Sequence, residues 1–504
     1  MVKKYDLVIL GGGSAGIVAG VMAGGLGMRV LLIEKYRMGG ECLNTGCVPS
    51  KAIIHAAHTA HVLRNASSVG LPSLPVSRDD ASGVMEWVRS SIDRVRFADA
   101  TEQLLKDQGV TLMIGEPRFE SPHKIAVGSE RFDARFTLIA TGSRPAIPAI
   151  PGLSGGYLTN QDIFNLDAIP ESLLVVGGGP IGVELGQAFA RLGSAVTLVH
   201  HGDRLLPRDD SELANVLLDT LREEGLAVHL KTSVVAARRK DWMRECTLQG
   251  PDGAHTVTVS HILLATGRQP NIESLGLDAA GVTTTKDGIV VDEHLRTSAG
   301  HIYACGDVTG QYQFSHMAEY EAKIAVRNMA FPGSSKADYT YAAWATFTDP
   351  EIVHIGMTED DARSAGLRYE VFRQPFAQND RAITDCATDG LVKVITAGPL
   401  GRILGVQIAG RRASELAGEW IMAIERGATI QAVADLVHVY PTLSMASQHA
   451  AQRWYAAKAD LPGVRPLLKA WSRGIQPNGS KLAAAAAITA GAAFLGKLTS
   501  DKRA

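Results

Sequence analysis

Two segments of this chain share one pattern, and that pattern limits the fold more than any other feature. Residues 5–34 read YDLVILGGGSAGIVAGVMAGGLGMRVLLIE, and residues 172–201 read SLLVVGGGPIGVELGQAFARLGSAVTLVHH. Each joins a β-branched apolar run to a glycine cluster, a stretch of helix formers and a second apolar run. This order is typical of a βαβ unit with parallel strands. The sequence therefore predicts an α/β fold with two Rossmann-like dinucleotide-binding domains.

The first glycine cluster has the spacing of a phosphate-binding turn. Gly11, Gly13 and Gly16 form G-x-G-x-x-G between the expected strand and helix. The glycines permit a tight turn and a close approach of the backbone to a pyrophosphate, which then faces the helix N-terminus. Glu34 follows at the end of the second strand, where a carboxylate accepts hydrogen bonds from a ribose.

The second glycine cluster has the same spacing, but no carboxylate follows it at the position that corresponds to Glu34. Its glycines are Gly177, Gly179 and Gly182. At the offset of Glu34 stands His200, followed by His201, Arg204 and Arg208. Without a carboxylate, and with basic groups near, a 2′-phosphate is accommodated better than a bare ribose. We therefore expect NADPH here, with NADH as the alternative.

A cysteine pair follows the first unit directly. Cys42 and Cys47 lie in GGECLNTGCVPSKA, residues 39–52. Residues five apart on one helix are separated by roughly 8–9 Å between Cα atoms, which is too far for a disulfide. We expect Cys42 in a bend before the helix, with Gly46 giving flexibility and Pro49 in the first turn. Cysteines near a helix N-terminus are reactive, so we predict a redox pair rather than half of a metal site.

Composition narrows the function classes. The chain has 504 residues, 50 Lys+Arg and 52 Asp+Glu, for a net charge of -2, which argues against a broad nucleic-acid or membrane surface. Five cysteines at this length are not a secreted disulfide scaffold. Only ten residues precede the first glycine run, too few for a signal peptide. We expect a cytoplasmic protein without nucleic-acid partners.

The motifs together resemble one family, the class I pyridine nucleotide–disulfide oxidoreductases. The resemblance covers about residues 5–458 and depends on GGGSAG, GGECLNTGCVPSK, IATGSRP, VVGGGPIGVELG, LLATGRQPN, IYACGDVTG and FTDPEIVHIGMTE. It implies that FAD binds at the first glycine turn (Gly11, Gly13 and Gly16, the first cradle) and a nicotinamide dinucleotide at the second (Gly177, Gly179 and Gly182, the second cradle). It also implies a C-terminal α+β domain that makes a homodimer. The expected domains are FAD-binding (1–150 and 271–340), NAD(P)-binding (151–270) and dimerisation (341–460), with an appendage at 461–504.

The resemblance also implies roles for single residues. Cys42 matches the thiol that exchanges with the acceptor, and Cys47 matches the thiol in charge-transfer contact with the flavin. Lys51 and Glu184 match an ion pair beside the flavin, and Asp307 matches an FAD ribitol ligand. The remaining cofactor residues implied by the repeated ATG motifs are Thr141 and Gly142 for FAD and Gly267 for NAD(P).

One stretch departs from the family pattern. Disulfide-reducing members carry H-x-H-P-T-x-x-E, whose second His and Glu serve the partner subunit. Here residues 438–445 read HVYPTLSM, with Tyr440 at the His position and Met445 at the Glu position. A phenol with a pKa of about 10 does not cycle protons near neutrality. The acceptor stays open between a disulfide, a quinone and a metal ion. The alternatives are a mercuric-type metal-ion reductase and a non-catalytic flavoprotein that binds lipoate or a partner.

Two further features carry weaker expectations. His55, His58 and His61 lie three residues apart on the expected helix, and we favour a solvated face over a metal site. The tail has an apolar run at residues 482–496, which as a helix reaches about 22 Å, short of the roughly 30 Å hydrocarbon core. A surface helix, a weak membrane contact and a flexible appendage are the alternatives, and we do not favour the membrane.

Overall fold

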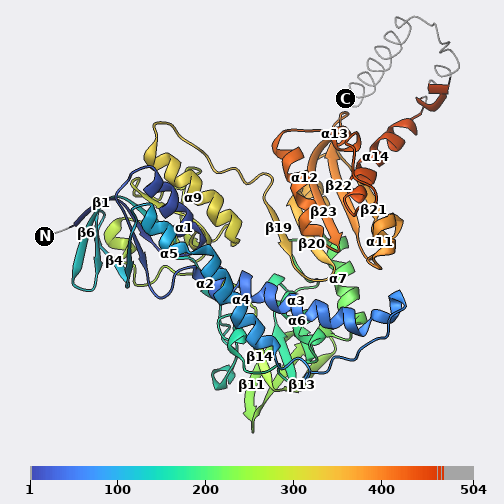
Figure 1. The fold of residues 1–504 in the computed structure, drawn as a ribbon, viewed down its shortest axis with the longest axis horizontal. Coiled ribbons are helices and arrows are strands. Elements are labelled where there is room, and N and C mark those ends of the chain that lie inside the picture. Colours follow the sequence, from blue (N-terminus) through green and yellow to red (C-terminus); the bar gives the residue numbers. More distant parts are fainter. Residues whose placement is uncertain (1–2, 463, 467, 470–504) are drawn as a thin grey trace, which may run out of the picture.

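The computed structural model describes residues 3–462, 464–466 and 468–469. These residues fold into an N-terminal part, a central part and a C-terminal part, and the N-terminal part combines the start of the chain (blue) with a later segment (yellow) in Figure 1. The expected α/β architecture with a separate C-terminal α+β part is confirmed.

The N-terminal part is built on a mainly parallel sheet with strand order β3-β2-β1-β6-β5-β4, and β18 pairs with β6. Its elements are β1 (Lys3–Leu10), α1 (Ser14–Gly25), β2 (Val30–Glu34), α5 (Thr101–Asp107), β3 (Thr111–Ile114), β4 (Pro117–Ser121), β5 (Lys124–Val127), β6 (Glu130–Ile139), α8 (Leu277–Ala280), β16 (Thr284–Thr285), β17 (Gly288–Ile289), β18 (Ile302–Ala304) and α9 (Ser315–Ala330). The chain thus leaves this part after β6, returns to it with α8 and rejoins its sheet with β18.

Small residues let two helices of this part pack closely. Ala15 and Ala19 of α1 belong to the same buried cluster as Ala318 and Ala322 of α9. Without larger side chains between them, the two helices lie side by side (Figure 1), and a Cβ on Gly306 would be within 4 Å of both Ala15 and Ala318. The starts of α1 and α9 therefore face the same region.

The central part repeats the design. A parallel sheet has the order β10-β9-β8-β14, and an antiparallel sheet β11-β12-β13 flanks it. The elements are β8 (Ser172–Val176), α6 (Pro180–Arg191), β9 (Ala195–Val199), α7 (Ser211–Glu223), β10 (Ala227–His229), β11 (Ser233–Lys240), β12 (Met243–Gly250), β13 (Gly253–Val259) and β14 (His261–Leu264). Strands β7 (Ser143–Pro145) and β15 (Arg268–Pro270) pair antiparallel where the chain crosses between the two parts.

Three helices connect the N-terminal and central parts: α2 (Gly40–Asn44), α3 (Cys47–Arg64) and α4 (Val84–Asp99). Helix α3 packs beside α6 in Figure 1, and Ile53 and Ala57 of α3 share a buried cluster with Val183 and Leu185 of α6. The cysteine-bearing segment is thereby held between the two dinucleotide units.

The C-terminal part is an antiparallel sheet with order β19-β20-β23-β22-β21, covered by helices. Its elements are β19 (Ala343–Thr346), β20 (Glu351–Gly356), α10 (Glu359–Ser364), β21 (Tyr369–Pro375), α11 (Asp380–Thr384), β22 (Leu391–Ala397), β23 (Arg402–Gly410), α12 (Ala413–Glu425), α13 (Ile430–Ala434) and α14 (Met445–Ala459). The fully buried Trp420 of α12 and Ala450 of α14 share one core with Val406 of β23.

Candidate active site

The first cradle is a backbone turn from which side chains are excluded. Gly11 has φ +110°, and a Cβ there would overlap the carbonyl oxygen of Ala140. A Cβ on Gly16 would overlap the carbonyl oxygen of Gly11. At the end of β2, the Glu34 carboxylate accepts the backbone N–H of Gly12 at 2.7 Å. The carboxylate predicted to meet a ribose is thus fixed directly beneath the phosphate-binding turn.

The second cradle has the same geometry with a different side chain at its edge. Gly177 has φ +122°, and a Cβ on Gly182 would overlap the Gly177 carbonyl oxygen. His200 Nδ1 accepts the backbone N–H of Gly178 at 3.2 Å, which is the bond that Glu34 makes in the first cradle. Because Nδ1 accepts, the proton of the neutral ring lies on Nε2. Burial lowers the pKa of His200, and His201 lowers it further.

Of the basic residues that follow His200, some line the cavity and one does not. The ring of His201 lies 4.7 Å from that of His200 between centroids. Arg208 lines the same cavity as His200, whereas Arg204 lies outside its lining and has a nitrogen 3.6 Å from Asp360 Oδ2. Of the predicted basic binders, His200, His201 and Arg208 therefore line this cavity, and Arg204 does not.

The cysteine pair sits at the junction of α2 and α3. Cys42 precedes α3 as expected, but it lies within the short helix α2 (Gly40–Asn44) and not in a bend. Cys47 is the first residue of α3, Gly46 precedes it, and Pro49 lies in the first turn as predicted. Both cysteines are thiols, and they are hydrogen-bond neighbours.

The two thiols have opposite proton affinities. The hydrogen bond from Cys42 lowers the pKa of Cys47 to about 6, and Ser315 and the charge of Lys51 act in the same direction. The pKa of Cys42 is raised well above its usual range by its hydrogen bond to Cys47 and by burial. Near neutrality the pair therefore holds a thiolate on Cys47 and a thiol on Cys42.

An ion pair borders the dithiol. Lys51 Nζ lies 2.9 Å from Glu184 Oε2, and it also lies 4.1 Å from the centroid of the Phe347 ring. The other oxygen of Glu184 accepts the backbone N–H of Phe347 at 2.9 Å. The carboxylate is buried, so the hydrogen bond and Lys51 together compensate its charge.

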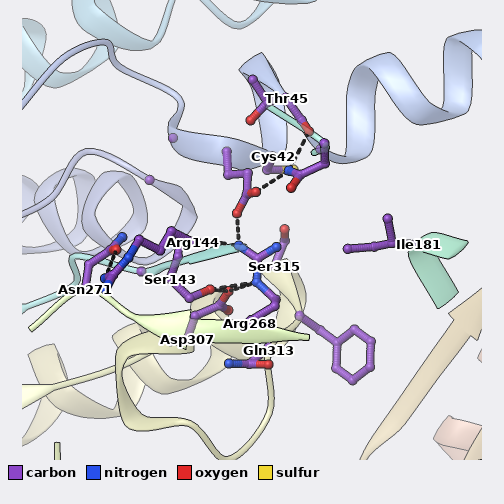
Figure 2. A pocket seen from close by; sticks show the side chains of 18 of the residues that line it. Cys42, Thr45, Ser143, Arg144, Ile181, Arg268, Asn271, Asp307, Gln313 and Ser315 are labelled. Atoms are coloured by element: carbon purple, nitrogen blue, oxygen red, sulfur yellow. Dashed lines mark hydrogen bonds and ion pairs between the residues drawn. The ribbon is translucent and has the colours of Figure 1, made fainter. Parts of the chain in front are cut away.

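A cluster around Arg268 also lines the site, and sequence reasoning identified only its Asp307. Asp307 Oδ2 accepts the Ser143 hydroxyl at 2.5 Å and lies 3.3 Å from Arg268 Nε. Arg268 also pairs with Glu41, next to Cys42. Figure 2 shows Arg268 between Asp307 and the segment that carries Cys42. Because Glu41 and Arg268 are 227 positions apart, no local pattern could have revealed their pairing.

Thr141 and Gly142 of the first ATG motif, and Gly267 of the second, also line the site. The Thr141 hydroxyl donates to the Asn271 carbonyl oxygen at 2.7 Å, and the Asn271 amide returns a bond to Thr141 O at 2.9 Å. Gly142 has φ +69° and Gly267 has φ +111°, and a Cβ on either would meet open space. The two glycines leave the cavity wall free of side chains.

One continuous cavity of about 3070 Å³ joins both cradles to the dithiol. Pockets for one drug-sized ligand have roughly 300–1,000 Å³, so this volume suits two dinucleotides. The turns free of side chains, Glu34 and Asp307 supply the donors and acceptors that FAD requires in the first half. His200 and the Gly177 turn supply them for a nicotinamide dinucleotide in the second.

The predicted acceptor-site residue lies elsewhere. Tyr440 is 66% exposed on the C-terminal part, and its hydroxyl donates to Asp380 Oδ2 at 3.0 Å. It is not among the described residues that line the dithiol cavity. Nearby, His438 Nε2 lies 2.8 Å from Glu419 Oε1, so a His–Glu pair forms there with a different carboxylate. Its imidazole is buried, and it anchors the loop that presents Tyr440.

The two weaker expectations concerned the histidines of α3 and the apolar run in the tail. His58 pairs with Asp349 at 3.2 Å and His61 with Asn65 at 3.1 Å. No cluster of metal-ligating side chains occurs among residues 3–462 and the few described beyond. The apolar run at residues 482–496 lies outside the described residues. In the described part, no helix has the length and apolarity needed to cross a membrane.

Comparison with known proteins agrees with this geometry. The family described as pyridine nucleotide-disulphide oxidoreductase matches residues 5–322, and its dimerisation domain matches residues 342–451. A dihydrolipoyl dehydrogenase of Thermus scotoductus is 36% identical over 454 residues, covering 89% of this chain and 97% of the relative. One of Haloferax volcanii is 37% identical, with 89% and 95% covered.

Solved structures give the same result. The HOCl-induced flavoprotein disulfide reductase RclA from Escherichia coli, solved as a Cu(II) complex, superposes with a TM-score of 0.80 at 26% identity, covering 90% of this chain and all of RclA. LpdA from Mycobacterium tuberculosis gives 0.81 at 28%, with the same coverage. The chain therefore belongs to the class I pyridine nucleotide–disulfide oxidoreductase family and is an oxidoreductase that uses FAD and NAD(P)H.

Proposed function

We propose that this enzyme passes electrons from NADPH through bound FAD to the Cys42–Cys47 pair, and from there to an acceptor that needs no partner imidazole. One observation carries this proposal: the two thiols touch at the start of α3, beside Lys51 and Glu184, on the wall of the cavity that joins both cradles. Cys386, by contrast, lies on the C-terminal part and lines no part of this cavity.

The electron and proton balance fits the two thiols. Bound FAD supplies the two-electron step between nicotinamide and sulfur. Hydride from NADPH brings two electrons and one proton; the Cys42–Cys47 S–S bond breaks, leaving a thiol on Cys42 and a thiolate on Cys47. A disulfide acceptor then takes both electrons, the Cys42 proton and one solvent proton, and the S–S bond re-forms. Lys51 stabilises the thiolate, and Cys42 donates its hydrogen bond to it.

The test uses anaerobic reduction of the purified holoenzyme. One equivalent of NADPH should produce the long-wavelength absorption of a thiolate in contact with oxidised flavin. Cys47→Ser should abolish this band, whereas the matched control Cys386→Ser should keep it. A band that survives in Cys47→Ser would exclude the assignment, and failure of NADPH to reduce the wild type would favour a non-catalytic flavoprotein.

The loop at Tyr440 limits the choice of acceptor. In a homodimer, which we infer from the dimerisation domain, this loop would reach the partner's dithiol. Val437 and Val439 beside it are 98% and 76% exposed, as expected for a surface that a second copy covers. The hydrogen bond to Asp380 raises the pKa of Tyr440, so the phenol is a poor proton donor to a leaving thiolate.

Lipoamide turnover should therefore be slow, although the relatives cited above are dihydrolipoyl dehydrogenases. The double substitution Tyr440→His with Met445→Glu restores the family pair. It should raise lipoamide turnover by about 100-fold, the lower range of general acid–base catalysis. If the wild type already turns over lipoamide as fast as the double variant, Tyr440 and Met445 do not limit lipoamide turnover.

A metal ion is the second candidate acceptor, favoured by the similarity to a reductase solved with Cu(II). The balance requires two Cu²⁺ ions, which take one electron each while the S–S bond forms and Cys42 releases its proton. Neither step needs an imidazole. NADPH oxidation stimulated by Cu²⁺ or Hg²⁺ and lost in Cys42→Ala would support this acceptor; no stimulation would remove it and leave disulfides and quinones.

A further inference from the structure

A serine hydroxyl from a helix distant in sequence contacts the reactive sulfur. Ser315 Oγ lies 3.4 Å from Cys47 Sγ, although 268 positions separate the two residues. Cys47 begins α3 and Ser315 begins α9, and neither helix has a side chain that caps its start. The packing of α9 against α1 fixes the position of Ser315, so the contact does not depend on a mobile loop.

We propose that Ser315 is a thiolate-stabilising residue of this enzyme: its hydroxyl donates a hydrogen bond to the Cys47 sulfur and keeps that sulfur charged in the reduced pair. This inference rests on the proposed function, because a thiolate on Cys47 matters only if the pair is redox-active.

The surrounding groups show why this donor matters. The groups that act on Cys47 are Cys42 from α2, Lys51 from α3, Glu184 from α6 and Ser315 from α9. Burial and the negative charge of Glu184 oppose the thiolate, and Lys51 is partly neutralised because it pairs with Glu184 at 2.9 Å. Hydrogen bonds from Cys42 and Ser315 must therefore supply much of the stabilisation, and the Cys42 bond disappears whenever that thiol reacts. Ser315 is then the remaining neutral donor among these groups.

The chain offers a closely matched control. Ser50 lies one turn into α3, and its hydroxyl donates to the backbone carbonyl oxygen of Cys47 at 3.1 Å, not to the sulfur. Ser50→Ala therefore removes a serine hydroxyl from the same segment without touching the thiolate. Ser315→Thr and Ser315→Val form a second comparison, because the two side chains have nearly the same shape and only Thr has a hydroxyl.

The experiment measures the pH dependence of Cys47 in two ways. Titration of the long-wavelength band in the two-electron-reduced holoenzyme follows the thiolate in contact with flavin. The pH profile of Cys47 alkylation by iodoacetamide, read by peptide mass spectrometry, follows the same thiolate without relying on the flavin band.

A charge-assisted hydrogen bond contributes roughly a tenfold change in an equilibrium. Both midpoints should therefore rise by about one pH unit in Ser315→Ala and Ser315→Val, and stay at the wild-type value in Ser315→Thr and Ser50→Ala. Unchanged midpoints in Ser315→Ala and Ser315→Val would overturn the proposal, as would an equal shift in Ser50→Ala. If the wild type shows no band but the alkylation midpoint shifts as stated, the role of Ser315 stands and the charge-transfer assignment fails.

Discussion

Replacing His200 by Glu should invert the dinucleotide preference of the second cradle. The substitution copies the first cradle, where Glu34 accepts the backbone N–H of Gly12 at 2.7 Å. The new carboxylate can accept the N–H of Gly178, as His200 Nδ1 now does at 3.2 Å. The turn should keep its shape, and only the group that faces the ribose changes.

The expected loss of NADP⁺ affinity follows because His200→Glu removes the imidazole N–H donor and adds a negative charge. A carboxylate about 5 Å from a 2′-phosphate, at an effective dielectric constant of about 20, opposes it by roughly 3 kcal/mol. This equals about 150-fold in the dissociation constant of NADP⁺. NAD⁺ should gain several-fold, since its ribose hydroxyls can donate to the carboxylate. His200→Gln, which adds no charge, should weaken NADP⁺ much less.

Isothermal titration calorimetry of the oxidised holoenzyme with NADP⁺ and NAD⁺ measures this change directly. Lowering the salt concentration should enlarge the effect, because the repulsion is screened by ions. An unchanged ratio of the two dissociation constants in His200→Glu would refute the reasoning, as would a wild type that binds NAD⁺ more tightly than NADP⁺.

Three further predictions concern charge. Because the pKa of Cys47 is lowered to about 6, its thiolate should dominate above that pH and be lost below it, so iodoacetamide at pH 7 should label Cys47 well before Cys42. Lys51→Met leaves the buried Glu184 without its cation and should move the Cys47 alkylation midpoint to higher pH, while Lys51→Arg should largely preserve it. Lys393 is 2% exposed and its Nζ lies 2.9 Å from Asp210 Oδ2, which joins the C-terminal part to the central part. Lys393→Met should lower the urea midpoint of unfolding by an amount equivalent to about 3–5 kcal/mol, because buried carboxylates lose their partner. An unchanged midpoint would show that this ion pair does not stabilise the fold.

Local patterns predicted the parts of the site that are local. The glycine spacing defines each turn because the residues are neighbours in sequence and the required backbone conformations exclude other side chains. The cysteine pair was recognisable for the same reason, although the helical turn that holds Cys42 was not expected. These features are encoded within a few residues, so the sequence alone sufficed.

Contacts across the fold could not be read in this way. Arg268 meets Glu41 where β15 pairs with β7, and Ser315 meets Cys47 because α9 packs against α1 in the first part of the fold. The pairing of Lys51 with Glu184 was available only through the family resemblance. Arg204 fits the pattern of a phosphate ligand in sequence, yet it pairs with Asp360 and does not line the cavity.

Peptide mapping of Cys42 and Cys47 before and after reduction is the most direct measurement of the central claim. In the oxidised holoenzyme, both residues should resist iodoacetamide and be recovered in one disulfide-linked peptide. After one equivalent of NADPH without oxygen, both should become alkylated, while Cys246 and Cys305 in the core remain unlabelled. Two free thiols before NADPH, or a linked peptide that persists after the flavin is reduced, would contradict electron flow through this pair.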